Sequence, residues 1–171
     1  MWENAAMTPS PRLVFASIVV ASVALVAFAV TYLQNSLGLE PCPMCILSRV
    51  TFIAIAVVCL VGAIHGPRGG IPLKVYGVLV ALLAAVGVGI SARHSWTQHH
   101  PPQFASCGAD LEFLLGNLPL SQSLPKIFQG SGSCSVIEWS FLGLTIPEWA
   151  GVWFAGIFVV ILWTAFRRVR A

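Results

Sequence analysis

The chain has 171 residues, of which 57% are hydrophobic and only 9% are charged, and its mean hydropathy is +0.87. Soluble domains carry roughly 25% charged residues, so the composition excludes an ordinary water-soluble globular protein. The formal net charge is +3. Because the basic residues stand at the ends of apolar runs rather than in one patch, we expect no nucleic acid among the partners.

Four apolar runs are long enough to cross a bilayer, which takes about 20 mostly apolar residues. In chain order they cover residues 13–33, 46–64, 73–92 and 149–166. The sequence therefore predicts an all-α membrane protein, a four-transmembrane-helix bundle that forms a single domain over residues 1–171. The two loops on one side of this bundle would cover about 34–45 and 93–148.

The distribution of Lys and Arg predicts the orientation, because loops rich in these residues stay in the cytoplasm. Arg12 precedes the first run, Arg68 and Lys74 flank the loop between the second and third runs, and three arginines follow the fourth run. Arg93 and Lys126 lie on the opposite side. Both termini are therefore expected in the cytoplasm, and the loops at 34–45 and 93–148 are expected outside it.

The first run also has a feature of a signal peptide. Ala27-Phe28-Ala29 is similar to a cleavage site, but the apolar stretch exceeds the 7–15 residues typical of a signal-peptide core. We expect a retained helix. Cleavage would leave the other three helices in the same orientation.

Four of the five cysteines, Cys42, Cys45, Cys107 and Cys134, fall on the predicted outer side. Oxidising compartments permit disulfides, so these four suggest two pairs. Three connectivities are open and the sequence does not choose among them, although proximity favours Cys42–Cys45, which leaves Cys107 for Cys134. Cys59 lies in the middle of the second run, where we expect a small buried packing residue.

Cys42-Pro43-Met44-Cys45 has the CxxC spacing of redox proteins, whose disulfide is easily opened by a thiolate. Proline is favoured at the first helical position, so we expect a helix to begin near Pro43 and to hold Cys45 in its first turn. The N–H groups and the dipole of a helix terminus stabilise a thiolate there. An inert local crosslink is the alternative.

Arg49 follows Cys45 by four residues and therefore lies on the same helix face, one turn farther in. A charged residue inside a membrane helix costs at least about 2.5–3.5 kcal/mol on insertion scales. We expect Arg49 to pair with an anion, either the Cys45 thiolate or a reduced electron acceptor. The alternative is that its side chain snorkels to the outer interface.

Histidines on the outer side raise the alternative of a zinc site, with His99, His100 and Cys107 as ligands. Zinc ligands usually come in CxxC or HxxxH pairs, and neither Cys107 nor Cys134 has such a neighbour, so we expect no metal. His94 stands at the outer end of the third run, where a lone histidine is more often structural.

The long loop at 93–148 has three notable segments. Pro101-Pro102 ends any continuation of the third helix. The interrupted apolar stretch at 111–120 is predicted either to lie on the membrane surface or to form an ordinary packed turn of helix. Gly130-Ser-Gly-Ser leads into Cys134, and because such stretches are flexible, it suits a cysteine that exchanges partners.

Together these features resemble the DsbB family of bacterial inner-membrane thiol oxidases. The resemblance covers most of the chain. It rests on the four runs, the PCxxC that opens the second, Arg49 four residues beyond, and the loop pair Cys107 and Cys134. The segment Phe104-Ala-Ser-Cys107 and residues 141–149 also resemble family segments.

The resemblance implies a disulfide relay at the periplasmic side of the bacterial inner membrane. A reduced DsbA-like thioredoxin-fold protein would attack the Cys107–Cys134 disulfide and form a mixed disulfide with Cys107. Cys134 would then attack Cys42, and Cys45 would leave as a thiolate and pass electrons to a membrane quinone, either ubiquinone or menaquinone. The expected catalytic residues are Cys42, Cys45, Cys107, Cys134 and Arg49, and the expected quinone-binding residues are Cys45, Arg49 and His94.

Three other interpretations remain open. Enzymes of the vitamin K epoxide reductase type also combine four helices with a quinone and a CxxC, but their CxxC sits on a late helix, the reverse of the order here. A paralogous thiol oxidase with a dedicated partner is a second. The third, from a different class, is a tetraspan structural or metal-handling protein with inert disulfides.

Overall fold

The computed structural model describes residues 10–39, 41–67, 70–100 and 134–166. Within these ranges four helices are long and apolar enough to cross a membrane, which confirms the expected all-α, four-helix fold. They are α1 (Pro11–Phe28), which continues as the π-helix η1 (Ala29–Ser36), α2 (Pro43–His65), α3 (Gly70–His99) and α6 (Ile146–Phe166). A short hairpin of β1 (Ser140–Phe141) and β2 (Leu144–Thr145) leads into α6.

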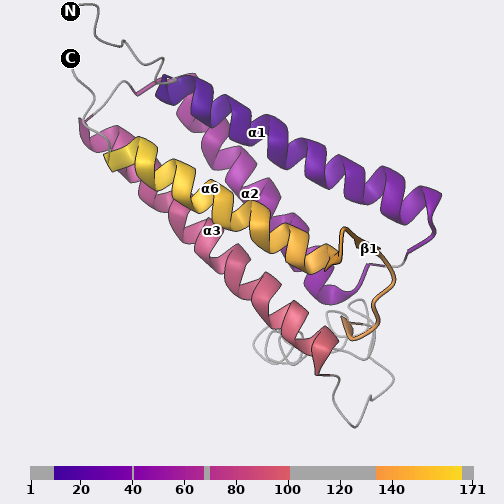
Figure 1. Ribbon diagram of the computed structural model, residues 1–171. Coiled ribbons are helices and arrows are strands. Elements are labelled where there is room, and N and C mark those ends of the chain that lie inside the picture. Colours follow the sequence, from indigo (N-terminus) through magenta and orange to yellow (C-terminus); the bar gives the residue numbers. More distant parts are fainter. Residues whose placement is uncertain (1–9, 40, 68–69, 101–133, 167–171) are drawn as a thin grey trace, which may run out of the picture.

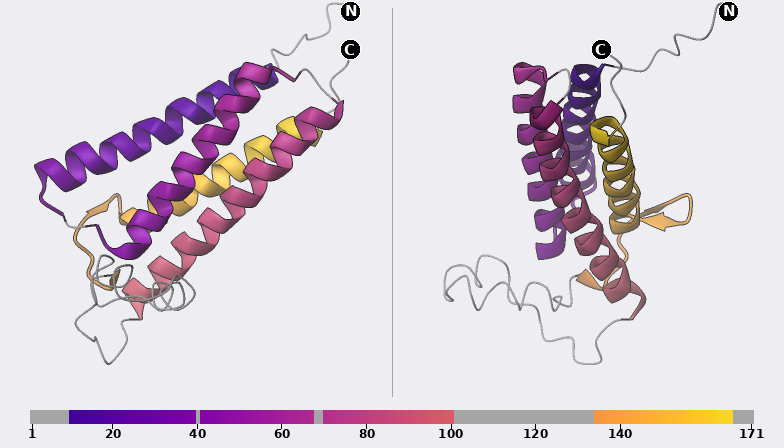
Figure 2. Two further views of the ribbon diagram at one scale, coloured as in Figure 1. Left: turned by 180° about the vertical axis from the view of Figure 1, so that it is seen from behind. Right: turned by 90° about the vertical axis from the view of Figure 1, so that its left-hand side faces the viewer.

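The helices pack as a bundle in which α1 lies along α2, α2 along α3, and α3 along α6 (Figures 1 and 2). The beginning of α1, the end of α2, the start of α3 and the end of α6 lie together at one end of the bundle. The end of η1, the start of α2, the end of α3 and the hairpin lie at the other end. The orientation of these two ends relative to a membrane stays a prediction.

One hydrophobic core joins all four helices, and aromatic residues fill its centre. Phe15 of α1 and Phe154 of α6 are fully buried, and the ring of Phe154 stacks on that of Phe52 from α2 at a centroid distance of 4.0 Å. Cys59 lies in the same core and is completely buried. The expectation that Cys59 is a packing residue is therefore confirmed.

Glycines allow α3 to approach α6 closely. A Cβ atom at Gly87 would stand 2.5 Å from the ring of Phe154, and one at Gly77 would stand 2.5 Å from the Cβ of Ala165. Neither contact is possible for real atoms, so any side chain at these two positions would push the helices apart. These close contacts hold α3 against α6 near the middle of both helices and where the start of α3 meets the end of α6.

The helix ends differ from the loop limits that the sequence predicted. The expected loop at 93–148 is too wide, because α3 continues through Arg93 and His94 to His99 and α6 begins at Ile146. The expected loop at 34–45 is too wide as well, because η1 ends at Ser36 and α2 begins at Pro43. An apolar run shows only which residues can lie in lipid. A helix can continue through polar residues beyond the end of such a run, until a residue such as proline breaks it.

A capping interaction fixes the start of α6 and ties it to α3. The backbone N–H of Thr145 donates to Glu148 Oε2 at 2.7 Å, the side-chain-to-backbone bond of a capping box. The other carboxylate oxygen, Oε1, accepts from Ser95 Oγ at 3.0 Å and lies 3.1 Å from His99 Nε2. One carboxylate therefore joins two helices beside the hairpin.

We expect Glu148→Ala to lower the free energy of unfolding by about 1–3 kcal/mol, because a helix cap and two interhelical contacts are lost together. Thermal unfolding in detergent micelles measures the change. Glu138→Ala is the matched control, since Glu138 is an exposed carboxylate in the segment before the hairpin, and it should change stability by less than about 0.5 kcal/mol. Equal effects of the two substitutions would contradict this role of Glu148.

Candidate functional site

The CxxC motif occupies the start of α2 as the sequence predicted. Cys42 is the residue before the helix, with an extended backbone (φ −66°, ψ 161°), and Pro43 is the first helical residue. Cys45 therefore lies in the first turn. The Cys42 thiol donates to Cys45 Sγ across 3.3 Å, a distance at which the sulfurs are in contact but not joined.

Two residues from distant parts of the chain meet Cys42. Its Sγ lies 3.6 Å from His94 Nε2 on α3, and the sulfur of Cys134, from the segment before the hairpin, completes a group whose ligand atoms all lie within 4.8 Å of one another. The exposed fractions of Cys42, His94 and Cys134 are only 7%, 3% and 1%. The fold thus brings one loop cysteine directly to the CxxC motif.

The surroundings of Cys42 change the acidity of its thiol. The hydrogen bond with Cys134 lowers the pKa of Cys42, but the contact with Cys45 and burial from water both raise it, and the net effect raises the pKa to about 12. Cys42 is thus held as a thiol that can donate to Cys45.

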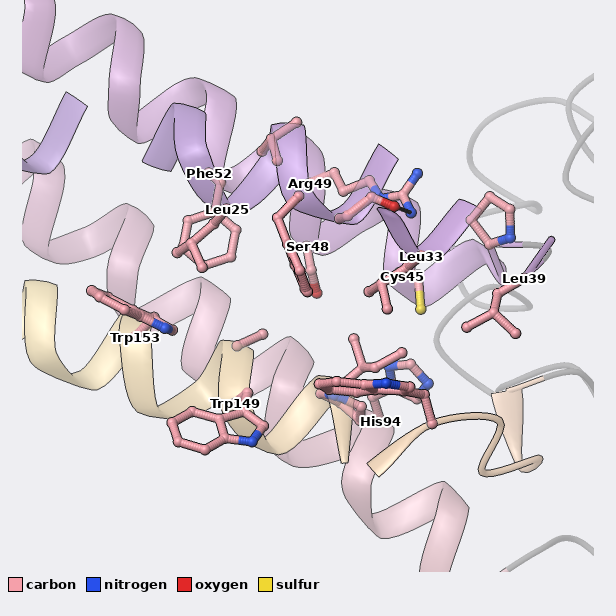
Figure 3. A pocket seen from close by; sticks show the side chains of 18 of the residues that line it. Leu25, Leu33, Leu39, Cys45, Ser48, Arg49, Phe52, His94, Trp149 and Trp153 are labelled. Atoms are coloured by element: carbon pink, nitrogen blue, oxygen red, sulfur yellow. Dashed lines mark hydrogen bonds between the residues drawn. The ribbon is translucent and has the colours of Figure 1, made fainter. Parts of the chain in front are cut away.

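A cavity of about 330 Å³ opens beside Cys45 between the helices (Figure 3). Its volume lies at the lower end of the range of small-molecule pockets. Cys45, Arg49 and His94 all contribute to its wall, so the three residues predicted to bind a cofactor share one cavity. Most of the remaining wall is apolar and comes from α1, η1, α2, α6 and the hairpin, including Leu25, Leu33, Phe52, Trp149 and Trp153.

Arg49 is held at this cavity by η1. Its guanidinium donates to Gln34 Oε1 at 2.8 Å and to the backbone carbonyl of Ala29 at 3.3 Å. Both acceptors are neutral, so these hydrogen bonds position the positive charge without cancelling it. The sequence does not predict Gln34 as a partner of Arg49, since its only signal is that it is a polar residue directly after the first apolar run.

Some predicted site residues lie elsewhere or outside the described residues. Cys107 lies outside them, as do Pro101-Pro102, the stretch at 111–120 and the Gly130-Ser-Gly-Ser approach to Cys134. His99 is exposed and contacts Glu148, while exposed His100 stacks on Trp96. Neither histidine joins the cluster of His94 and the cysteines.

Comparison with known proteins gives one consistent result. The sequence profile of the family "Disulfide bond formation protein DsbB" matches residues 11–164. A "Disulfide bond formation protein B" from Aromatoleum aromaticum is 48% identical over 141 residues, which cover 82% of this chain and 84% of that protein. Proteins of the same name from an Azoarcus species and from Paracidovorax citrulli are each 43% identical, over 96% and 99% of this chain and 99% and 93% of their own lengths.

Proposed function

Because the chain belongs to the DsbB family and is therefore a disulfide-forming oxidoreductase of the membrane, we propose that it reoxidises a periplasmic DsbA-like thioredoxin-fold protein and passes the electrons to a membrane quinone. Four apolar helices and the family agree with a multi-pass protein of the bacterial inner membrane. The observation that carries the proposal is the position of Cys42, whose sulfur lies within 4.8 Å of that of Cys134 and 3.3 Å from that of Cys45, a residue of the cavity wall.

The relay consists of thiol–disulfide exchanges. The reduced partner attacks the Cys107–Cys134 disulfide, forms a mixed disulfide with Cys107 and releases Cys134 as a thiolate. Cys134 attacks Cys42 in the Cys42–Cys45 disulfide, which forms a Cys42–Cys134 bond and releases Cys45. The cluster of Cys42, Cys134 and His94, all within 4.8 Å, supports the second exchange because attacking and attacked sulfur already lie near each other.

The cavity beside Cys45 has the chemistry that a quinone requires. A quinone headgroup is a flat, largely apolar ring with two carbonyl acceptors, and the wall combines aromatic and aliphatic side chains with the donors Arg49 and His94. When bound, the quinone accepts the electron pair and two protons. The chain's own contribution is to aim Cys45 into the cavity and to exclude water from it.

Arg49 and the helix terminus favour the release of Cys45 in its anionic form. The guanidinium carries a permanent charge and shares the cavity wall with Cys45. The N–H groups of the first turn of α2, in which Cys45 lies, add further donors. A good leaving group speeds thiol exchange, so this arrangement directs the electron pair toward the cavity.

The proposal is tested by quinone-dependent oxidation of a reduced DsbA-like protein with the detergent-solubilised full chain. Turnover is followed separately with ubiquinone and menaquinone by the absorbance of the quinone and by the thiol content of the partner. With at least one of the two quinones, we expect one quinone to be reduced for every two thiols that the partner loses. No turnover with either quinone would refute the proposal. Disulfides that stay closed when the reduced partner is added would favour a structural role.

The order of the relay predicts a trapped complex. In Cys134→Ser the Cys107 thiol has lost its internal partner, so it exchanges with the oxidised form of the DsbA-like protein, and we expect their mixed disulfide to accumulate on a non-reducing gel. The band should disappear in Cys107→Ser/Cys134→Ser and persist in Cys59→Ala/Cys134→Ser. An adduct that depends on Cys42 instead would show that our order is wrong.

A further inference from the structure

Cys42, His94 and Cys134 form a group with the chemistry of a metal site. Their three ligand atoms lie within 4.8 Å of one another although they come from α2, α3 and the segment before the hairpin. All three side chains are buried. Two thiolates and an imidazole are soft or borderline ligands that favour Zn²⁺ over Mg²⁺ or Ca²⁺, which prefer oxygen.

The distance between Cys42 and His94 matches that between two ligands of a tetrahedral zinc ion, and the other two distances in the group are at most 4.8 Å. With Zn–S bonds of about 2.3 Å and Zn–N bonds of about 2.0–2.1 Å, neighbouring ligand atoms in a tetrahedron are roughly 3.5–3.8 Å apart. Cys42 Sγ and His94 Nε2 are 3.6 Å apart. Cys45 Sγ lies 3.3 Å from Cys42 Sγ but is not part of the three-residue group, so the fourth ligand would be a water molecule. Only small side-chain movements would be needed to hold an ion.

We propose that the reduced chain binds one Zn²⁺ ion through Cys42, His94 and Cys134, and that this ion holds the chain in a reduced, inactive state. Binding moves no electrons: the thiols of Cys42 and Cys134 each release a proton to solvent and become zinc ligands. A disulfide at either cysteine removes a ligand, so only the reduced form can bind. This proposal departs from the expectation of no metal that the sequence supports, and it does not depend on the identity of the quinone or the partner.

The first test compares Zn²⁺ binding by the reduced and the oxidised chain and requires no substitution. Zn²⁺ is titrated into the full chain in detergent, reduced with a phosphine or oxidised with quinone, in competition with a chromophoric chelator. We expect one equivalent to bind the reduced chain with release of protons, and binding to the oxidised chain to be at least about tenfold weaker. Equal affinity for the two forms would overturn the proposal.

Substitutions identify the ligands. We expect Cys134→Ser and His94→Gln each to weaken Zn²⁺ binding at least about tenfold. The matched controls Cys59→Ala and His100→Gln should leave the affinity unchanged, since Cys59 lies in the helix core and His100 is exposed beyond α3. Co²⁺ bound to the reduced chain should show the thiolate charge-transfer absorption of a tetrahedral site, and Cys134→Ser should weaken that absorption. Binding that is lost in His100→Gln and kept in His94→Gln would place the ion on the surface histidines and refute the assignment.

Discussion

We expect the replacement of Cys45 by serine to abolish the proposed quinone reduction, with turnover lowered at least about a thousandfold. A serine hydroxyl neither forms the disulfide that Cys134 must open nor leaves as a stable anion, so the electron pair has no path to the cavity. The measurement is the rate of quinone absorbance change with a reduced DsbA-like protein as donor.

Two comparisons make the Cys45→Ser result specific. Cys59→Ala also removes a sulfur from α2, but from the buried core, and it should keep full turnover. Exchange between the partner and the Cys107–Cys134 disulfide should also survive in Cys45→Ser, because Cys45 is absent from that step. Quinone reduction at more than a few per cent of the normal rate would show that another sulfur delivers the electrons.

Removing the charge of Arg49 produces the second large effect. In Arg49→Gln we expect kcat/KM for the quinone to fall about 10- to 100-fold, or about 1.4–2.8 kcal/mol. An opposite charge a few ångströms from a thiolate is worth this much or more, and the substitution also breaks the hydrogen bonds to Gln34 and Ala29. The assay varies quinone concentration at a saturating level of the thiol partner.

Controls distinguish the position of Arg49 from its charge alone. Arg49→Lys should recover part of the activity, because lysine restores the charge without the planar fork that reaches two acceptors. Lys74→Gln removes a positive charge from an exposed residue of α3 at the opposite end of the bundle and should have no effect. A fall in kcat/KM for the thiol partner rather than for the quinone would contradict a role of Arg49 at the cavity.

Much of this arrangement follows from the sequence. The four apolar runs predict four membrane helices, because each run reaches the length of about 20 mostly apolar residues that a helix needs to cross a bilayer. Pro43 predicts where α2 begins, and the position of Cys45 in its first turn follows from that start. Helical periodicity then predicts that Arg49, four residues farther on, lies on the same face of α2 as Cys45. These are local features, encoded within a few residues of one another.

The parts that the sequence did not predict depend on tertiary packing. Cys134 and His94 reach Cys42 because α2, α3 and the segment before the hairpin meet at the same end of the bundle, and no local sequence pattern encodes that meeting. Gln34 becomes a partner of Arg49 only because η1 continues α1 beyond the apolar run. The length of α3 was also missed, because hydropathy measures burial in lipid and not the persistence of a helix.

The π-helix η1 at the end of α1 gives the first membrane helix a role at the cavity, because it binds Arg49. η1 supplies both acceptors that hold Arg49, and the side chain of Gln34 must face α2 to do so. An insertion or deletion of one residue between Phe28 and Gln34 would rotate that side chain by roughly a quarter of a turn around the helix axis. The rotation of η1 about its axis therefore decides where the guanidinium of Arg49 lies. A change in that rotation would alter the cavity beside Cys45 without replacing a cysteine.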